Sequence, residues 1–325
     1  MKEVVFLQKN KKRWEEFDAY FTEGRRHDPD RMAELYIQLT DDLAYAQTYY
    51  PQSKTTQYLN ELTLKAHRII YVNKREKTNR ISKFWKFEYP KIMFDNKKYV
   101  LYSFIIFFIS VLIGIISSAY DDNFVRLILG DNYVNMTLDN IEHGDPMAVY
   151  KTANEVDMFL GISLNNLFVA FRAFVFGIFL SIGTGYVLFQ NGVMLGSFQY
   201  FFYKYGLLYE SVKVIWIHGT LEIFAIIVAG AAGLRLGNSI LFPGTYSRSK
   251  SFQKGVLQGI KMMFGLIPVF ITAAFLEGFV TRLTKMPEVL SLSLIFLSLL
   301  FIIYYFYIYP KKISKNNLYE LQRSD

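Results

Sequence analysis

Three residues in the apolar part of the chain carry side chains that bind metals or transfer protons. His218 and Glu222 are separated by four residues, and Glu277 lies in a later apolar segment. Residues at i and i+4 share one face of a helix, so the imidazole and the first carboxylate can touch. One imidazole and two carboxylates match the ligand types of a catalytic zinc centre that keeps a water in the open position. A neutral histidine bonded to a carboxylate also satisfies both groups without a metal, so both interpretations stay open.

Further polar side chains occur at the same expected depth. An ionisable side chain in hydrocarbon costs about 2.5 to 3.5 kcal/mol on insertion scales, so each one needs a partner or a function. We expect Asn165 and Asn166 to cap a helix start, and Arg172 to bind a carboxylate or backbone carbonyls. The predicted intramembrane polar cluster comprises seven residues: Asn165, Asn166, Arg172, Asn191, His218, Glu222 and Glu277.

Small residues recur at every fourth position in two apolar segments, one of which comes directly after His218 and Glu222. Ala225, Ala229 and Gly233 form one stripe, and Gly192 and Gly196 form another. Small residues at this spacing allow two helix backbones to approach closely in a membrane. We therefore predict that both stripes pack against other helices, and they could also join two copies of the chain into a homodimer.

The elements that carry these residues belong to a membrane protein. The chain has 325 residues, of which 52% are hydrophobic and 20% charged. Residues 1–98 contribute a net charge of +6, residues 120–163 contribute −6, and residues 164–325 contribute +8. The long, nearly uncharged stretches between these charges match the thickness of a bilayer. We predict an all-α, polytopic membrane helix bundle of about six crossings with a small soluble helical module at the N-terminus.

The apolar segments suggest where the chain crosses. Spans are expected at about 99–118, 164–187, 211–234, 256–280 and 289–309, whereas the more polar segment 188–208 either crosses or re-enters. Residues 235–256 carry four basic residues and no acid, which places this loop in the cytoplasm. A cytoplasmic position of this loop requires the segment 188–208 to cross the membrane. The chain then has six crossings, with both termini in the cytoplasm. The acidic segment 120–163 would then be an external loop with small helices, one of them starting at Asp145-Pro146.

Outside the predicted bundle, residues 1–80 show the periodicity of three amphipathic helices, and residues 311–325 form a basic tail within the predicted cytoplasmic side. The short apolar run at the start of the chain does not resemble a secretory signal. Residues 81–98 mix lysines with bulky aromatics just before the first span, and the bundle itself is expected over 99–310. Such a segment is typical of the membrane interface and favours anionic lipid heads over the alternative of nucleic acid, which we do not expect as a partner.

The residues around the polar cluster resemble a known family. The string His218-Gly219-Thr220-Leu221-Glu222-Ile223 is similar to the signature of the stage II sporulation protein M family. Asn165-Asn166, Asn191-Gly192 and Glu277-Gly278 occur in the order that the family shows. The N-terminal part, with Trp14, resembles the long members that carry a cytoplasmic helical extension. The resemblance implies a protein of the bacterial cytoplasmic (inner) membrane, similar to a scaffold that works with partner proteins to place peptidoglycan hydrolases.

Three functions are compatible with these patterns. The first, which we favour, is a non-enzymatic assembly protein that binds membrane or envelope proteins through its bundle and cytoplasmic helices. The second is a transporter, channel or lipid-translocating protein that uses the polar cluster. The third is an intramembrane metal-dependent hydrolase with zinc or another divalent metal on His218, Glu222 and Glu277; without it, no cofactor is expected. The absence of cysteine excludes thiolate sites and disulfides, and no glycine-rich phosphate loop is present.

Overall fold

The computed structural model describes residues 2–22, 29–72, 80–148, 154–283 and 286–314, and the regular secondary structure in these ranges is entirely helical. The predicted all-α class is confirmed. The chain divides into two compact units, residues 1–79 and 80–325.

The N-terminal unit consists of the three predicted amphipathic helices. They are α1 (Glu3–Thr22), α2 (Pro29–Tyr49) and α3 (Lys54–Val72). Ser53 caps α3 by accepting a hydrogen bond from the Thr56 backbone N–H at 3.1 Å. The apolar stripes of the three helices form one core, which buries Phe6, Trp14, Phe17, Leu35, Leu39, Ala46, Leu59, Leu62 and Ala66.

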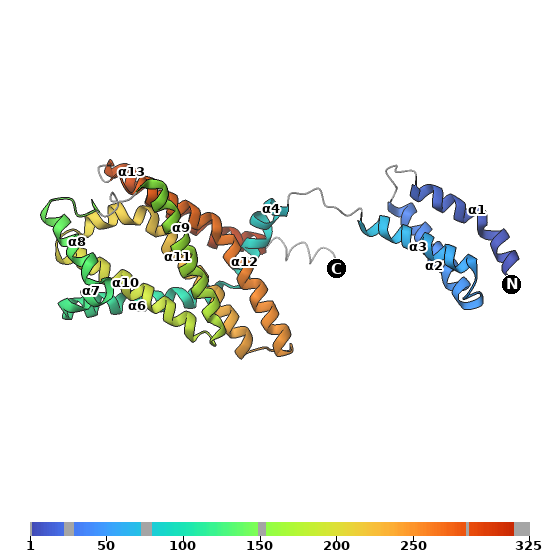
Figure 1. Cartoon of the computed structure of the whole chain (residues 1–325), viewed down its shortest axis with the longest axis horizontal. Helices are drawn as coiled ribbons and strands as arrows, with labels where there is room; N and C mark the ends of the chain where they lie inside the picture. Colours follow the sequence, from blue (N-terminus) through green and yellow to red (C-terminus); the bar gives the residue numbers. More distant parts are fainter. Residues whose placement is uncertain (1, 23–28, 73–79, 149–153, 284–285, 315–325) are drawn as a thin grey trace. The chain divides into compact units, whose positions relative to one another are not determined.

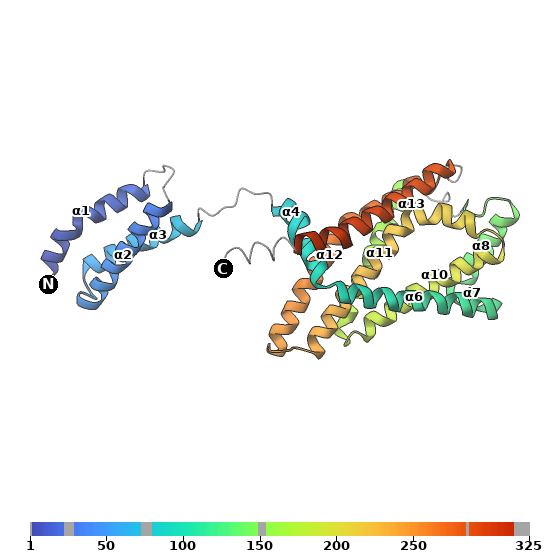
Figure 2. The ribbon, with the colours of Figure 1, turned by 180° about the vertical axis from the view of Figure 1, so that it is seen from behind.

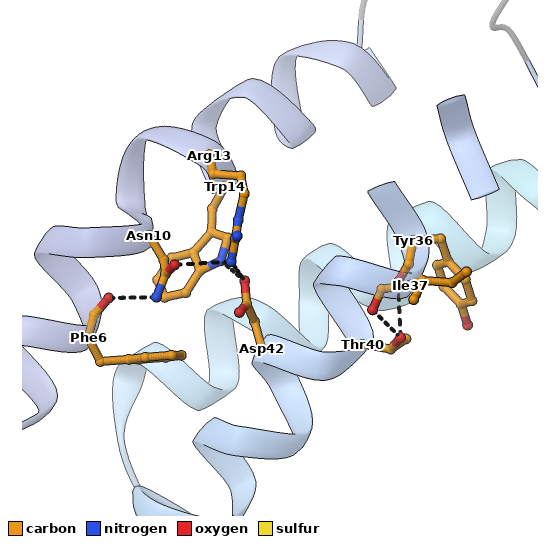
Figure 3. A network of polar contacts seen from close by, with 8 residues as sticks. All are labelled: Phe6, Asn10, Arg13, Trp14, Tyr36, Ile37, Thr40 and Asp42. Carbon is orange, nitrogen blue, oxygen red and sulfur yellow. Dashed lines mark hydrogen bonds and ion pairs between the residues drawn. The ribbon is translucent and has the colours of Figure 1, made fainter. Parts of the chain in front are cut away.

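A polar network inside this unit joins α1 to α2 (Figure 3). Asp42 accepts a hydrogen bond from Trp14 Nε1 at 2.8 Å and forms an ion pair with Arg13. The Asp42 side chain is only 14% exposed, so its two partners stabilise a largely desolvated charge. This contact explains why a tryptophan on the first helix can be buried to 2% exposure without losing its hydrogen bond.

The second unit contains the helices of the bundle and the short segments that join them. The longer elements are α6 (Lys97–Tyr120), α9 (Glu155–Val175), α10 (Ile182–Lys204), α11 (Leu208–Leu241), α12 (Arg248–Phe275) and α13 (Glu288–Ile302). Five spans in the described residues are long and apolar enough to cross a membrane: Lys97–Tyr120, Phe159–Ile178, Leu208–Leu241, Arg248–Val280 and Glu288–Ser314.

Helix α11 forms the centre of the bundle. It packs against α6, α9, α10, α12 and α13, and 78% of its most apolar window is buried, against 22% for α6. Figures 1 and 2 show α11 running between α12 and the α6–α10 pair. The outer helices instead turn bulky side chains outward, such as Phe104 and Phe108 of α6 at 50% and 51% exposure, as expected for a surface in contact with lipid.

Most of the segment 188–208, for which crossing and re-entry both stayed open, belongs to α10. This element is one continuous helix of 23 residues. At about 1.5 Å per residue it is as long as a membrane crossing requires, although its polar residues make it less apolar than the five spans. It lies side by side with α6 in both views (Figures 1 and 2). Gly192 touches Phe107 and Ser110 on α6, whereas Gly196 touches Val111 and Ile115 one turn further on, so the two helices are parallel.

The predicted span 164–187 is corrected by the structure. Helix α9 ends at Val175, a single turn η3 (Phe176–Ile178) follows, and α10 starts at Ile182. Leu180 and Ser181 between them have positive φ angles of 54° and 71°, a conformation that surrounding packing must impose on residues other than glycine. The apolar run continues through this reversal, so the hydropathy pattern carries no sign of it.

Two short helices occupy the acidic segment, as expected of a loop with small helices. They are α7 (Asp122–Leu129) and α8 (Asp131–Glu142), and both lie at the same end of the bundle (Figure 1). The expected helix start at Asp145-Pro146 is a turn in its described part, and residues 149–153 lie outside the described residues. The segment also ends earlier than 163, because α9 begins at Glu155.

The basic and aromatic segment before α6 is helical. It comprises α4 (Arg80–Lys83), η1 (Phe84–Glu88) and α5 (Tyr89–Asp95). Tyr89 is fully buried against Gly265 of α12 and Tyr305 of η5 (Ile303–Ile308). The part of the segment around Tyr89, Ile92 and Met93 therefore belongs to the bundle core, and its lysines and Phe87 remain on the exposed side.

Candidate functional site

His218 and Glu222 lie on consecutive turns of α11 near the middle of its length. The helix is continuous over 34 residues, so the four-residue spacing holds both side chains on one face. His218 is 4% exposed. Glu222 is partly buried and borders a cavity.

Glu277 reaches this face from a different element. Helix α12 changes into the π-helical segment η4 (Leu276–Val280), in which Thr281 N–H bonds the carbonyl of Leu276 at 2.8 Å. The wider turn carries Glu277 and Thr281 at the end of a long apolar helix. Segments of this kind are frequent at functional sites because they alter the direction of the side chains that follow.

The three chemically active side chains converge. One potential ligand atom from each of His218, Glu222 and Glu277 lies within 4.8 Å of the others. His218 Nε2 is 3.7 Å from Glu277 Oε2, and His218 Nδ1 is 3.0 Å from Thr281 Oγ1. Thr281 Oγ1 donates to the Leu276 carbonyl at 3.1 Å, so it accepts from His218, and this places the imidazole proton on Nδ1. The Nε2 lone pair consequently faces the carboxylate of Glu277.

Asparagines from two further helices lie beside this cluster. Asn166 of α9 is 5% exposed, and its side-chain amide interacts with the carboxylate of Glu222. Asn165 points its own Nδ2 at Asn166 Oδ1, at 3.4 Å. Asn191 of α10 donates to the carbonyl of Val187 at 2.8 Å. Neither asparagine of α9 caps a helix, because α9 begins ten residues earlier, where Asn154 accepts a bond from Val156 N–H.

The histidine, the two glutamates and the three asparagines of the predicted cluster line one cavity of about 600 Å³. Its wall comes from α6, α7, α8, α9, α10, α11 and η4, and six members of the predicted polar cluster border it: Asn165, Asn166, Asn191, His218, Glu222 and Glu277. Ile128, Leu129 and Tyr133 extend the wall to the end of the bundle where α7 and α8 lie. Burial raises the pKa of the Tyr133 phenol, so this side chain stays uncharged at neutral pH.

Arg172, the seventh member of the predicted cluster, lies elsewhere. It is in the last turn of α9, with its guanidinium 5.9 Å and 5.7 Å from the rings of Phe168 and Phe176. Six residues of helix separate it from Asn166, which is about 9 Å along the axis. The two aromatic rings stabilise the guanidinium charge through cation–π contacts. Arg172 does not border the cavity.

The small residues Ala225, Ala229 and Gly233 follow Glu222 toward the C-terminal end of α11. Ala225 and Ala229 are fully buried. Gly233 packs directly on the backbone of Ala173 and against Thr184, and the backbone of Gly177 approaches Gly233 in turn. Gly192 and Gly196 lie at the α6–α10 contact described above. Each of the three glycines adjoins another helix or turn of the same chain, and a Cβ at any of them would collide with that neighbour.

Residues 103–282 match the family described as stage II sporulation protein M. This region runs from α6 to the end of η4 and covers more than half of the chain, including every residue of the polar cluster. The chain belongs to the stage II sporulation protein M family. Residues 4–72 match a second family, described as a domain of unknown function (DUF8413). No curated protein and no solved structure matches the chain.

The resemblance to the stage II sporulation protein M family is thus confirmed, and with it the assignment to membrane proteins. Two residues of the site were not anticipated from the sequence. Thr281, which orients His218, lies next to Arg282 where a span ends, and a threonine there carries no distinctive signal. Tyr133 belongs to a segment that reads as an external loop, so only the fold brings it to the same cavity.

Proposed function

We propose that this member of the stage II sporulation protein M family transports a cation across the membrane, with the cavity as the chamber that receives the ion. The observation that carries this proposal is the cavity itself. It extends from the end of the bundle where α7 and α8 lie to two carboxylates at the level of the middle of α11. An assembly protein requires no such chamber.

The charges favour a cation over an anion. The cavity wall includes Glu222 and Glu277, and among the described residues that line it there is no lysine or arginine. The neighbouring segment 120–163 has a net charge of −6. A cleft lined by one sign of charge between walls of low dielectric concentrates ions of the opposite sign.

Toward the other end of the bundle, glycines of α11 pack closely against neighbouring helices. Gly233 of α11 packs on Ala173 of α9, and Gly230 packs against Leu188 of α10 and Ser103 of α6. These contacts lie about two to three turns beyond Glu222 on the same helix. In the described arrangement the cavity lies on the α7 and α8 side of these contacts, so passage of an ion requires the contacts to separate.

The proposed orientation follows from six crossings. Helix α10 is parallel to α6, so the chain returns through α9 between them and both ends of the unit fall on one side. The positive-inside rule assigns that side, which bears Lys97, Lys98 and the loop before α12, to the cytoplasm of a bacterial inner membrane. The exposed lysines of residues 81–98 then face anionic lipid heads on the cytoplasmic leaflet.

Flux through purified protein tests the proposal. Proteoliposomes are loaded with ion-selective dyes and given Na⁺, K⁺, Mg²⁺ or Zn²⁺ outside. We expect at least one cation to enter faster than into empty vesicles, with Glu222→Gln at the empty-vesicle rate. Glu210→Gln is the matched control, because Glu210 lies on the same helix outside the cavity and pairs with Lys213. Equal rates in protein-containing and empty vesicles for every cation would refute transport.

A second candidate, the assembly role, is supported by the N-terminal unit. Residues 1–79 form a compact unit with their own core, and this unit matches a family of its own. A compact helical module of this kind is a suitable binding site for other membrane or envelope proteins. Affinity capture from native membranes, with the full chain and with residues 1–79 deleted, tests this role. We expect a specific partner to disappear on deletion, and an unchanged set of partners would exclude the module from assembly.

A further inference from the structure

We propose that His218, Glu222 and Glu277 bind one divalent transition-metal ion of the zinc class through one imidazole nitrogen and two carboxylate oxygens. The inference rests on the proposed function, because it names the ion that the cavity takes. Binding and transport are measured separately below, so that the failure of one can be told from the failure of the other.

The separation of the side chains suits such a site. Two ligand atoms about 2.1 Å from a tetrahedral zinc ion are about 3.4 Å apart. His218 Nε2 and Glu277 Oε2 are already 3.7 Å apart, and the whole set lies within 4.8 Å. Rotation of the two glutamate side chains is enough to shorten these distances to the values of a zinc site, so the helix backbones need not move.

The contact between His218 and Thr281 is the second feature of a metal site. Histidines that bind metals almost always donate their other ring N–H to a nearby oxygen, which fixes the tautomer and the ring orientation. Here Nδ1 donates to Thr281 Oγ1 at 3.0 Å, and Thr281 is itself fixed by the Leu276 carbonyl. The other ring nitrogen, Nε2, is the one that faces Glu277.

A residue of α9 supports one of the two carboxylates. Asn166 is 5% exposed, borders the cavity and interacts through its side-chain amide with the carboxylate of Glu222. An amide that faces a ligating carboxylate orients its oxygens, as the outer partners of metal sites do.

The ligand types select the class of ion. Imidazole together with carboxylate suits zinc and its first-row neighbours, whereas magnesium and calcium prefer oxygen ligands alone. The absence of cysteine from the chain removes thiolates from consideration. Two carboxylates and a dication also sum to zero charge, which reduces the cost of keeping the site within the bundle.

Metal binding by the purified full-length protein tests the inference. The protein is stripped with a chelator, titrated with Co²⁺ as a visible reporter of the zinc geometry, and then loaded with Zn²⁺ and analysed for metal per chain. We expect one equivalent of Zn²⁺ and the visible bands of four-coordinate Co²⁺. His218→Gln and Glu277→Gln should each weaken binding by more than the roughly 10- to 100-fold typical of losing an outer partner. Glu210→Gln should bind as the parent does.

Size-exclusion profiles and melting temperatures verify that each variant is folded. A folded parent that binds no Zn²⁺ or Co²⁺, or a folded His218→Gln that binds as tightly as the parent, would overturn the metal site. The flux assay separates the two proposals. Zn²⁺ binding without flux of any cation supports the site and refutes transport, whereas flux of Na⁺ or K⁺ without Zn²⁺ binding supports transport and refutes the site.

Discussion

The Nδ1 atom of His218 lies 3.0 Å from Oγ1 of Thr281, and this contact joins α11 to the π-helical end of α12. It sets the direction in which the second imidazole nitrogen points, toward Glu277. Thr281, which is not one of the proposed metal ligands, thus determines which ring nitrogen of His218 faces Glu277.

Removing the acceptor of this bond should weaken metal binding. In Thr281→Val the shape of the side chain is kept but the His218 N–H loses its partner, so we expect Zn²⁺ affinity to fall by about 10- to 100-fold. Thr281→Ser keeps the hydroxyl and should bind almost as the parent does. Competition of each variant with a chromophoric chelator measures the affinities. Equal affinities for Thr281→Val and Thr281→Ser would show that the hydroxyl does not orient the imidazole.

The contact between Gly177 and Gly233 should limit the stability of the bundle. A methyl group at Gly177 would collide with the Gly233 carbonyl, so Gly177→Ala should destabilise the protein by about 1 to 3 kcal/mol through overpacking. The control is Gly185→Ala, because nothing lies within 4 Å of its Cβ position. Thermal unfolding in mild detergent should show a lower midpoint for Gly177→Ala alone. A normal midpoint for that variant would mean that the two helices do not approach so closely.

The N-terminal core should unfold separately from the bundle. Leu39 is fully buried and Ile37 is 59% exposed on the same helix, so Leu39→Ala should cost about 2 to 5 kcal/mol and Ile37→Ala much less. Limited proteolysis of the full chain should cleave Leu39→Ala more rapidly within residues 1–72. Metal binding should remain as in the parent for both variants. Equal cleavage of the two variants would contradict the described core.

The proposed topology can be tested without background labelling, because the chain contains no cysteine. Asn132 on α8 and Thr245 in the loop before α12 are both exposed. With six crossings, Asn132→Cys should react with an impermeant maleimide on intact cells and Thr245→Cys only after permeabilisation. Reaction of both variants on intact cells would remove one crossing, and α10 would be the segment to reconsider.

The sequence anticipated much of this site because polar residues are rare in apolar helices. Spacing alone placed His218 and Glu222 on one face, and the long continuous helix α11 preserves that face. Glu277 joins them through a contact between distant segments, which spacing along the chain does not determine. Arg172 shows the limit of the approach, since two aromatic rings beside it explain its position without any contact to the cluster.

The reversal between α9 and α10 could not be read from the sequence. Hydropathy identifies apolar length, and the residues from Phe176 to Ile182 are almost all apolar. Leu180 and Ser181 take positive φ angles because α11 packs against the turn: Ser181 Oγ donates to the Leu234 carbonyl at 3.3 Å. A tertiary contact therefore decides where one span ends and the next begins.

X-ray absorption at the zinc edge of the loaded protein tests the central claim most directly. We predict a four-coordinate ion with one imidazole, two carboxylate oxygens and one water at about 2.0 to 2.2 Å, and loss of the imidazole scattering in His218→Gln. A six-coordinate shell of oxygen alone, unchanged by that substitution, would contradict a metal site at the centre of this bundle.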